Sequence, residues 1–170
     1  AGGNLSSGDD ILNAGTVTGG AGTITTADDI RNEATGVFTQ GAGNVIAGGD
    51  LRNANIFTGN TGAISVNTGV FLNEATGTFT GGTGALTVAL GAATNEGLMT
   101  LAAGGDFSVS ANSFTNGVAG QFTSGVGTIA IAGDLVNNAA GAGFYNANTP
   151  NGTTNITGNL DNNGIFNALD

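Results

Sequence analysis

The 170-residue sequence contains no cysteine, no histidine and no tryptophan, and only two basic residues stand against 12 acidic ones. Without cysteine no disulfide holds the fold, and without cysteine or histidine the metal sites and catalytic triads built on those side chains are excluded. The net charge of −10 leaves almost nothing to neutralise a phosphate backbone, so nucleic acid is not expected as a partner.

Charge of either sign is scarce, at 8% of residues, whereas 39% of residues are hydrophobic. This balance supplies material for a core and argues against disorder. Long apolar runs are missing too, because no stretch reaches the ~18 apolar residues that a membrane-spanning helix needs. The chain is therefore expected to fold around a core of its own, without a membrane span.

Glycine is abundant, with 33 residues, and the sequence repeats. A hydrophobic residue, any residue and then asparagine recur so that successive asparagines are 19 to 25 positions apart, and Ala93 takes the hydrophobic place in one unit. The eight asparagines of the pattern are Asn13, Asn32, Asn53, Asn73, Asn95, Asn116, Asn137 and Asn162. Eight copies in 170 residues correspond to about 21 residues per copy, which is typical of a solenoid.

Two further patterns complete each unit. After the turn that follows each asparagine comes a bulky apolar residue, namely Val17, Phe38, Phe57, Phe79, Met99, Phe122, Tyr145 and Phe166. A third segment alternates with a period of two after a glycine, as at residues 62–66 and 84–88. That period indicates strands and not helices.

Three short strands in each unit predict an all-β fold in which every unit is one coil of a parallel β-solenoid, with about eight coils of about 21 residues. Coils stacked about 4.8 Å apart would form a rod roughly 40 Å long. We expect a single solenoid domain over residues 1–170, without an evident cap at either end.

Stacking places equivalent side chains above one another, which assigns a role to each column. The asparagines are predicted to form a ladder in which each side-chain amide donates to the asparagine of the neighbouring coil; ligand binding is the alternative. The bulky column is predicted to stack in the core. The alternative is a register shifted by one residue, in which the phenylalanines would lie on the surface and stack against carbohydrate.

The residue before each bulky one would then point outwards. This outward column consists of Thr16, Val37, Ile56, Thr78, Leu98, Gln121, Phe144 and Ile165. Five of its members are apolar, which favours lateral packing against another chain, although the stripe could also lie under the chain's own turns. With only two threonines, the column argues against ice binding.

Acidic residues gather before the first strand of several units, at Asp9, Asp10, Asp28, Asp29, Asp50 and Asp134. We interpret them as solvated caps of turn N–H groups, and expect no cofactor; calcium between the coils is the alternative. Arg31 and Arg52 share a column next to Asp29 and Asp50. Salt bridges are the expected arrangement there, and the remote alternative is a polysaccharide-active enzyme that uses Asp and Arg in a side groove.

The string Gly-Asp-Leu-x-Asn-x-(Gly/Asn)-x-Phe at residues 49–57, followed by Gly-x-Ile-x-Val at 62–66, resembles the repeats of filamentous-haemagglutinin-like proteins. The resemblance covers nearly the whole chain. It implies a right-handed parallel β-helix and a secreted bacterial protein, located extracellularly or at the cell surface. Such repeats build the shaft of an adhesin, and a host or surface glycan would be the partner of its tip.

The two ends of the repeat complement each other. The last unit stops after Leu160, Asn162 and Phe166, whereas Gly3, Asn4, Leu5 and Ser6 look like an isolated third strand. The eight residues after Asn162 and the 13 residues up to Asn13 together make 21, the internal period. We therefore predict a structural protein without catalytic residues that stacks head to tail into an extracellular fibre. The alternative is a shaft segment of a large adhesin of the two-partner-secretion or autotransporter type.

Overall fold

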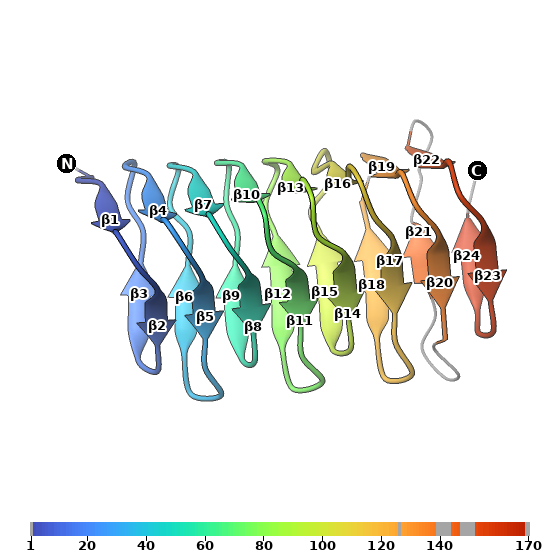
Figure 1. Ribbon diagram of the computed structural model, residues 1–170, viewed down its shortest axis with the longest axis horizontal. Coiled ribbons are helices and arrows are strands. Elements are labelled where there is room, and N and C mark those ends of the chain that lie inside the picture. Colours follow the sequence, from blue (N-terminus) through green and yellow to red (C-terminus); the bar gives the residue numbers. More distant parts are fainter. Residues whose placement is uncertain (1, 126, 139–143, 147–151, 169–170) are drawn as a thin grey trace.

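The computed structural model describes residues 2–125, 127–138, 144–146 and 152–168. For residues 144–146 and 167–168 it places the backbone only. All regular structure in these residues is β-strand, so they include no helix long and apolar enough to cross a membrane. The strands form three parallel sheets of eight strands each, and successive coils of about 21 residues wind into a rod of about seven turns (Figure 1).

Each coil contributes one strand to each sheet, so every third strand belongs to the same sheet. Sheet A contains β1 (Leu5–Ser7), β4 (Ile24–Thr26), β7 (Val45–Ala47), β10 (Ile64–Val66), β13 (Leu86–Val88), β16 (Phe107–Val109), β19 (Thr128–Ile131) and β22 (Thr153–Ile156). Sheet B contains β2 (Ile11–Asn13), β5 (Ile30–Asn32), β8 (Leu51–Asn53), β11 (Phe71–Asn73), β14 (Ala93–Asn95), β17 (Phe114–Asn116), β20 (Leu135–Asn137) and β23 (Leu160–Asn162). Sheet C contains β3 (Thr16–Thr18), β6 (Val37–Thr39), β9 (Ile56–Thr58), β12 (Thr78–Gly81), β15 (Leu98–Leu101), β18 (Gln121–Ser124), β21 (Phe144–Asn146) and β24 (Phe166–Ala168). The predicted β-solenoid, with about 21 residues and three strands per coil, is confirmed.

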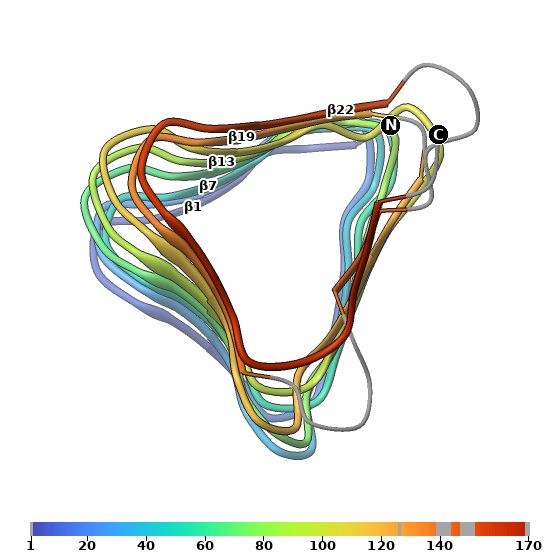
Figure 2. The same cartoon turned by 90° about the vertical axis from the view of Figure 1, so that its right-hand side faces the viewer.

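The three sheets form the sides of a three-sided tube, seen along its axis in Figure 2. In the three-residue strands of sheets A and B in the interior coils, the two outer residues are buried and the middle residue is not. In sheet C the middle residue is the buried one. Because side chains alternate along a strand, this pattern directs hydrophobic residues into the tube and leaves threonine, serine and arginine outside.

The core is a set of apolar columns that run along the axis. Phe57 packs between Phe38 and Phe79, with ring centroids 4.6 and 5.0 Å apart and the first pair nearly parallel at 7°. This distance follows from the spacing of about 4.8 Å between parallel strands. Met99 and Phe122 continue the column and are fully buried. Val17 and Phe166, at its two ends, are only partly buried.

The backbone register of β21 differs from the sequence prediction. Phe144 pairs with Phe122 and Phe166, while Tyr145 pairs with Thr123 and Asn167. In the backbone, Phe144 thus holds the position that the sequence prediction gave to Tyr145 in the bulky column, and Tyr145 holds the position of the threonines beside that column. Two adjacent aromatic residues fit the repeat in either of two registers, and a shift by one residue exchanges the faces of a strand. The side chain of Tyr145 itself lies outside the described residues.

Glycine at the corners allows the coils to approach each other this closely. A Cβ atom on Gly77, where the turn after β11 ends, would lie 2.4 Å from the backbone oxygen of Asn53 in the preceding coil. At the corner before β13, a Cβ atom on Gly84 would lie 2.1 Å from the backbone oxygen of Gly62. Backbone oxygens cannot yield without moving the whole coil, so larger residues are excluded at both positions.

Candidate functional site

The eight asparagines at the ends of the sheet B strands form one file along the rod. Seven hydrogen bonds of 2.8–3.0 Å link them, and in each the Nδ2 atom donates to the Oδ1 atom of the next asparagine towards the C-terminus. Asn53 through Asn137 in this file are fully buried, Asn13 is 4% exposed, and Asn162 is exposed. The side chains thus lie as the ladder interpretation requires, with a defined direction of donation.

The amides of the file also donate to backbone oxygens at the corner between sheets B and C. Asn73 donates to the backbone oxygens of Gly77 and Leu98 at 3.2 and 3.0 Å, and Asn95 donates to that of Gln121 at 2.9 Å. The amide therefore satisfies carbonyl groups of a buried corner in its own coil and in the next one. Since these interior amides are engaged and shielded from solvent, the geometry favours a structural role over ligand binding.

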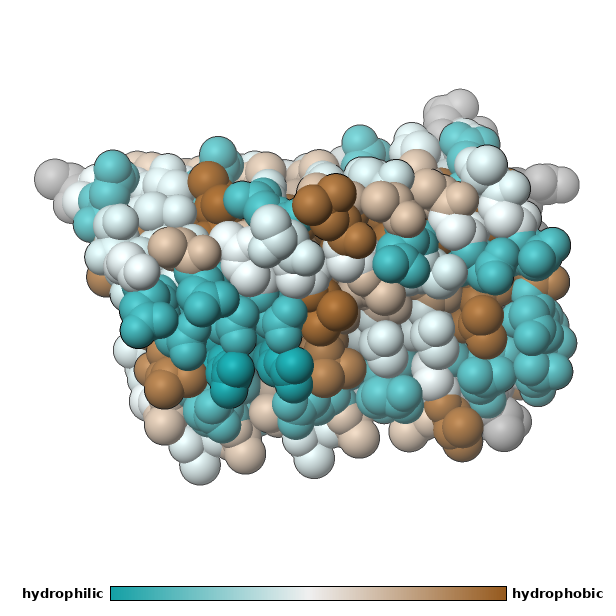
Figure 3. All heavy atoms as spheres, viewed as in Figure 1, coloured by the Kyte–Doolittle hydropathy of each residue, from teal (hydrophilic) through white to brown (hydrophobic). Residues whose placement is uncertain are grey.

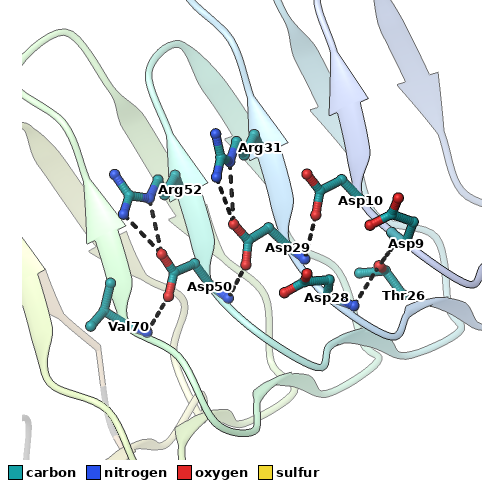
Figure 4. A network of polar contacts seen from close by, with 9 residues as sticks. All are labelled: Asp9, Asp10, Thr26, Asp28, Asp29, Arg31, Asp50, Arg52 and Val70. Atoms are coloured by element: carbon teal, nitrogen blue, oxygen red, sulfur yellow. Dashed lines mark hydrogen bonds and ion pairs between the residues drawn. The ribbon is translucent and has the colours of Figure 1, made fainter.

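A second file, of carboxylates, joins the coils at the corner between sheets A and B (Figure 4). Asp10 accepts the backbone N–H of Asp29 at 3.1 Å, Asp29 accepts that of Asp50, and Asp50 accepts that of Val70, the last two at 2.8 Å. At the far end of the rod Asp134 accepts the N–H of Asn159 at 2.7 Å. Sequence reasoning expected these residues to cap turns locally and missed the bond to the next coil. The signal was that an aspartate stands directly before the sheet B strand in four of the eight coils.

The two arginines project from the middle of neighbouring sheet B strands, and each pairs with the aspartate two residues before it. Arg31 lies 2.8 Å from Asp29, and Arg52 lies 2.9 Å from Asp50. Burial alone would raise the pKa of the Asp29 carboxyl, but the hydrogen bonds from Arg31 and from the Asp50 N–H outweigh it and lower that pKa. Figure 3 shows hydrophilic side chains gathered over the N-terminal strands of this sheet. The salt bridges expected from the sequence are therefore confirmed.

Replacing Arg31 with methionine is expected to raise the pKa of Asp29 towards that of a buried, unpaired carboxyl. The pair stabilises the fold above the ordinary aspartate pKa, and this contribution is lost as the pH falls through the lowered pKa of Asp29. The variant should therefore lose stability mainly near neutral pH and converge with the parent in acid. Carboxyl titration by NMR and denaturation at several pH values measure the two effects. An unchanged Asp29 pKa would contradict the assignment.

Asp9, Asp10 and Asp28 lie together next to these pairs, each with a carboxylate oxygen within 4.8 Å of the others. The neighbouring charge of Asp29, followed by desolvation, raises the pKa of Asp28. All three side chains are exposed or nearly so. Calcium between the coils stays the untested alternative to the predicted solvated caps.

A hollow of about 220 Å³ opens on the outer face of sheet A near the C-terminal end. Small side chains line it, among them Ser108, Ser110, Ala130, Asn155 and Thr157, and its lining holds no carboxylate and no arginine. The arginine and aspartate pairs belong to sheet B. The structure therefore does not bring the groups of the polysaccharide-cleavage hypothesis into this hollow.

The outer face of sheet C holds a threonine column beside the apolar one. Thr39, Thr58 and Thr80 are half-buried on this face. In the outward column Ile56, Leu98 and Ile165 are 41–43% exposed. Among the described residues neither column contains a charge. Lateral packing on this face stays a prediction.

The residues predicted for axial assembly lie at opposite ends of the rod (Figure 1). Gly3 to Ser6 lead into and form part of β1, and Leu160, Asn162 and Phe166 lie on β23 and β24. Leu5 and Leu160 are 45% and 48% exposed, whereas Ile24 and Leu135, which pair with them in the adjoining coils, are 4% and 0% exposed. Each end therefore presents apolar side chains that interior coils bury.

In comparisons with family models, curated proteins and solved structures, nothing matches this chain. The resemblance to filamentous-haemagglutinin-like repeats accordingly stays a prediction.

Proposed function

We propose that this chain is a structural protein, a rigid β-solenoid subunit that stacks head to tail into an extracellular or cell-surface fibre. The observation that carries the proposal is the state of the two ends. All three sheets finish in a strand with one unpaired edge, β1, β2 and β3 at one end and β22, β23 and β24 at the other. Unpaired strand edges recruit further strands unless something blocks them.

Three features of the ends support axial growth. In the part of the chain that the structure describes, no helix or loop crosses either end coil. The exposed Leu5 and Leu160 would become buried by a further coil. The first and last described strands of the chain, β1 and β24, meet the same corner of the tube, between sheets C and A (Figure 2). A copy placed on the axis would therefore meet its neighbour in phase.

The same features fit a second candidate, a shaft segment of a large secreted adhesin. Further coils of one polypeptide would then cover the open edges, and the path of the coil could continue at the corner between sheets C and A, where β24 ends and β1 begins (Figure 2). The mass of the native polypeptide separates the candidates. A species near 16.3 kDa favours the stacking subunit, and a much larger species favours the shaft segment.

The test of the fibre proposal is the size of the purified chain as a function of concentration. We expect size-exclusion chromatography to show species that grow with concentration. Electron microscopy should show rods whose lengths are multiples of roughly 40 Å, the length of eight stacked coils. A folded chain that remains monomeric at millimolar concentration would overturn the proposal, because the exposed edges would then not recruit one another.

A further inference from the structure

Resting on the proposed stacking, we infer that the joint has a fixed polarity: the C-terminal face of one copy binds the N-terminal face of a second copy, and Asn162 donates to Asn13 across it. The partner is thus a second copy of this chain in one orientation only. Hydrogen-bond direction, strand register and coil phase each lead to this arrangement.

The direction of the asparagine ladder points to one orientation of the joint. Every link runs from an Nδ2 atom to the Oδ1 atom of the next coil towards the C-terminus. At the N-terminal end, the Oδ1 atom of Asn13 accepts only the N–H of Gly15, at 3.2 Å, among the described residues. At the C-terminal end, Asn162 donates one N–H to the oxygen of Gly164 at 3.0 Å. Its second N–H, which interior members give to the next asparagine, has no acceptor among the described residues. One end is an open acceptor and the other an open donor.

The carboxylate file supplies an independent match. In five of the seven steps between coils, a side-chain oxygen of the residue before the sheet B strand accepts the backbone N–H of its counterpart one coil on, as Asp29 does from Asp50. Val70 and Ala92, which hold this position in two coils, have no side-chain oxygen. Asp10 holds this position in the first coil, and its own N–H has no partner among the described residues. Asn159 holds the position in the last coil, where its N–H is bound to Asp134 and its exposed side chain carries an oxygen of the required type. Stacking in the inferred sense gives the Asp10 N–H that acceptor.

The phase of the coils also agrees. Continuing the observed register places Leu160 on Ile11, Asp161 on Leu12 and Asn162 on Asn13 of the next copy. Phe166 then falls on Val17, at the two partly buried ends of one core column. The opposite orientations fail on the ladder. Two N-terminal faces would oppose acceptor to acceptor, and two C-terminal faces would oppose donor to donor.

Disulfide trapping tests the polarity, since the natural chain has no cysteine to interfere. Leu12 and Asp161 are both exposed and occupy the same outward column on the two end strands. In the inferred joint their Cα atoms would lie about 4.8 Å apart, within the range that a disulfide spans. Chains with Leu12→Cys and chains with Asp161→Cys, one of them mass-tagged, are mixed and oxidised gently. We expect the mixed disulfide to exceed either like-with-like disulfide by roughly tenfold or more.

A pair of charge-matched variants tests the donor. Asn162→Asp still accepts from Asn137 but turns a carboxylate oxygen towards the Oδ1 atom of Asn13, so end-to-end association should weaken by roughly tenfold or more. Asn159→Asp adds the same charge to the same end coil and keeps an acceptor, as Asp29 and Asp50 do. We expect it to remain within about threefold of the parent. Sedimentation measures both.

The outcomes separate the two proposals. If the parent chain assembles but the cysteine variants form mainly like-with-like disulfides, the polarity is overturned, and with it the head-to-tail order of the fibre, while end-to-end association of the copies still stands. Equal loss of assembly in Asn162→Asp and Asn159→Asp would show that charge alone acts at the joint, and would overturn the donor role of Asn162. If the parent chain forms no end-to-end species at all, the fibre proposal itself fails.

Discussion

Replacing Phe57 with alanine is expected to lower the free energy of unfolding by about 3–5 kcal/mol. The ring is fully buried and stacks on Phe38 and Phe79 with centroids 4.6 and 5.0 Å away. Truncation leaves a cavity in the middle of the column, and the coils above and below cannot close it. Their spacing is set by backbone hydrogen bonds, and any collapse would break these bonds in all three sheets. Urea denaturation followed by circular dichroism measures the loss.

Ile56 provides the matched control, because it precedes Phe57 in β9 and its side chain lies on the outer face, 42% exposed. Ile56→Ala should cost less than about 1 kcal/mol. Each coil contacts only its neighbours, so Phe57→Ala should also broaden the transition as the two halves of the rod begin to unfold separately. Equal losses in the two variants would mean that the register of β9 is shifted by one residue and that Phe57 does not face the core.

The fold was predictable because the sequence repeats the pattern of one coil eight times. Asn32, Asn53 and Asn73 recur at intervals of one coil. In the parallel sheet, Asn53 pairs with Asn32 on one side and with Asn73 on the other. A polar residue that returns at the edge of a hydrophobic strand has few places in a solenoid other than a buried corner, so the position of the file followed from the spacing. The direction of donation did not follow from the spacing, because an asparagine side chain has both a donor and an acceptor. The sequence does not tell whether it donates to the preceding coil or to the following one.

The features that the sequence could not settle depend on how corners bend. Tyr145 was assigned to the bulky column, yet in the backbone register it is Phe144 that pairs with Phe122. The bonds from Asp29 and Asp50 to the next coil were likewise hidden. A sequence shows that an acid precedes a strand, and only the corner geometry shows that its carboxylate reaches across the interval of about 4.8 Å between coils.

Replacing Asn73 with aspartate is expected to be at least as damaging as the loss of Phe57, at about 3–5 kcal/mol near neutral pH. Asn73 is fully buried, accepts from Asn53 and donates to Asn95, Gly77 and Leu98. An aspartate keeps the bond from Asn53. It removes every donor, however, and places a negative charge against three oxygen atoms with no cation among the residues that contact it. Thermal and urea denaturation of the variant and the parent measure the difference.

The pH dependence identifies the charge as the cause. In the folded variant, burial and the opposing oxygens raise the pKa of the new carboxyl above the ordinary aspartate value of about 3.9 that holds in the unfolded chain. The folded state therefore binds a proton over a range in which the unfolded state does not. The deficit relative to the parent is largest above the raised pKa and shrinks as the pH falls towards about 4. A protonated carboxyl can also donate to Asn95, as the amide did.

Asn44→Asp is the control, because Asn44 is exposed and its Oδ1 atom only accepts, from the N–H of Ala63. That change should stay within about 0.5 kcal/mol of the parent at every pH. A deficit in Asn73→Asp that does not vary with pH would point to lost packing and not to the direction of the ladder.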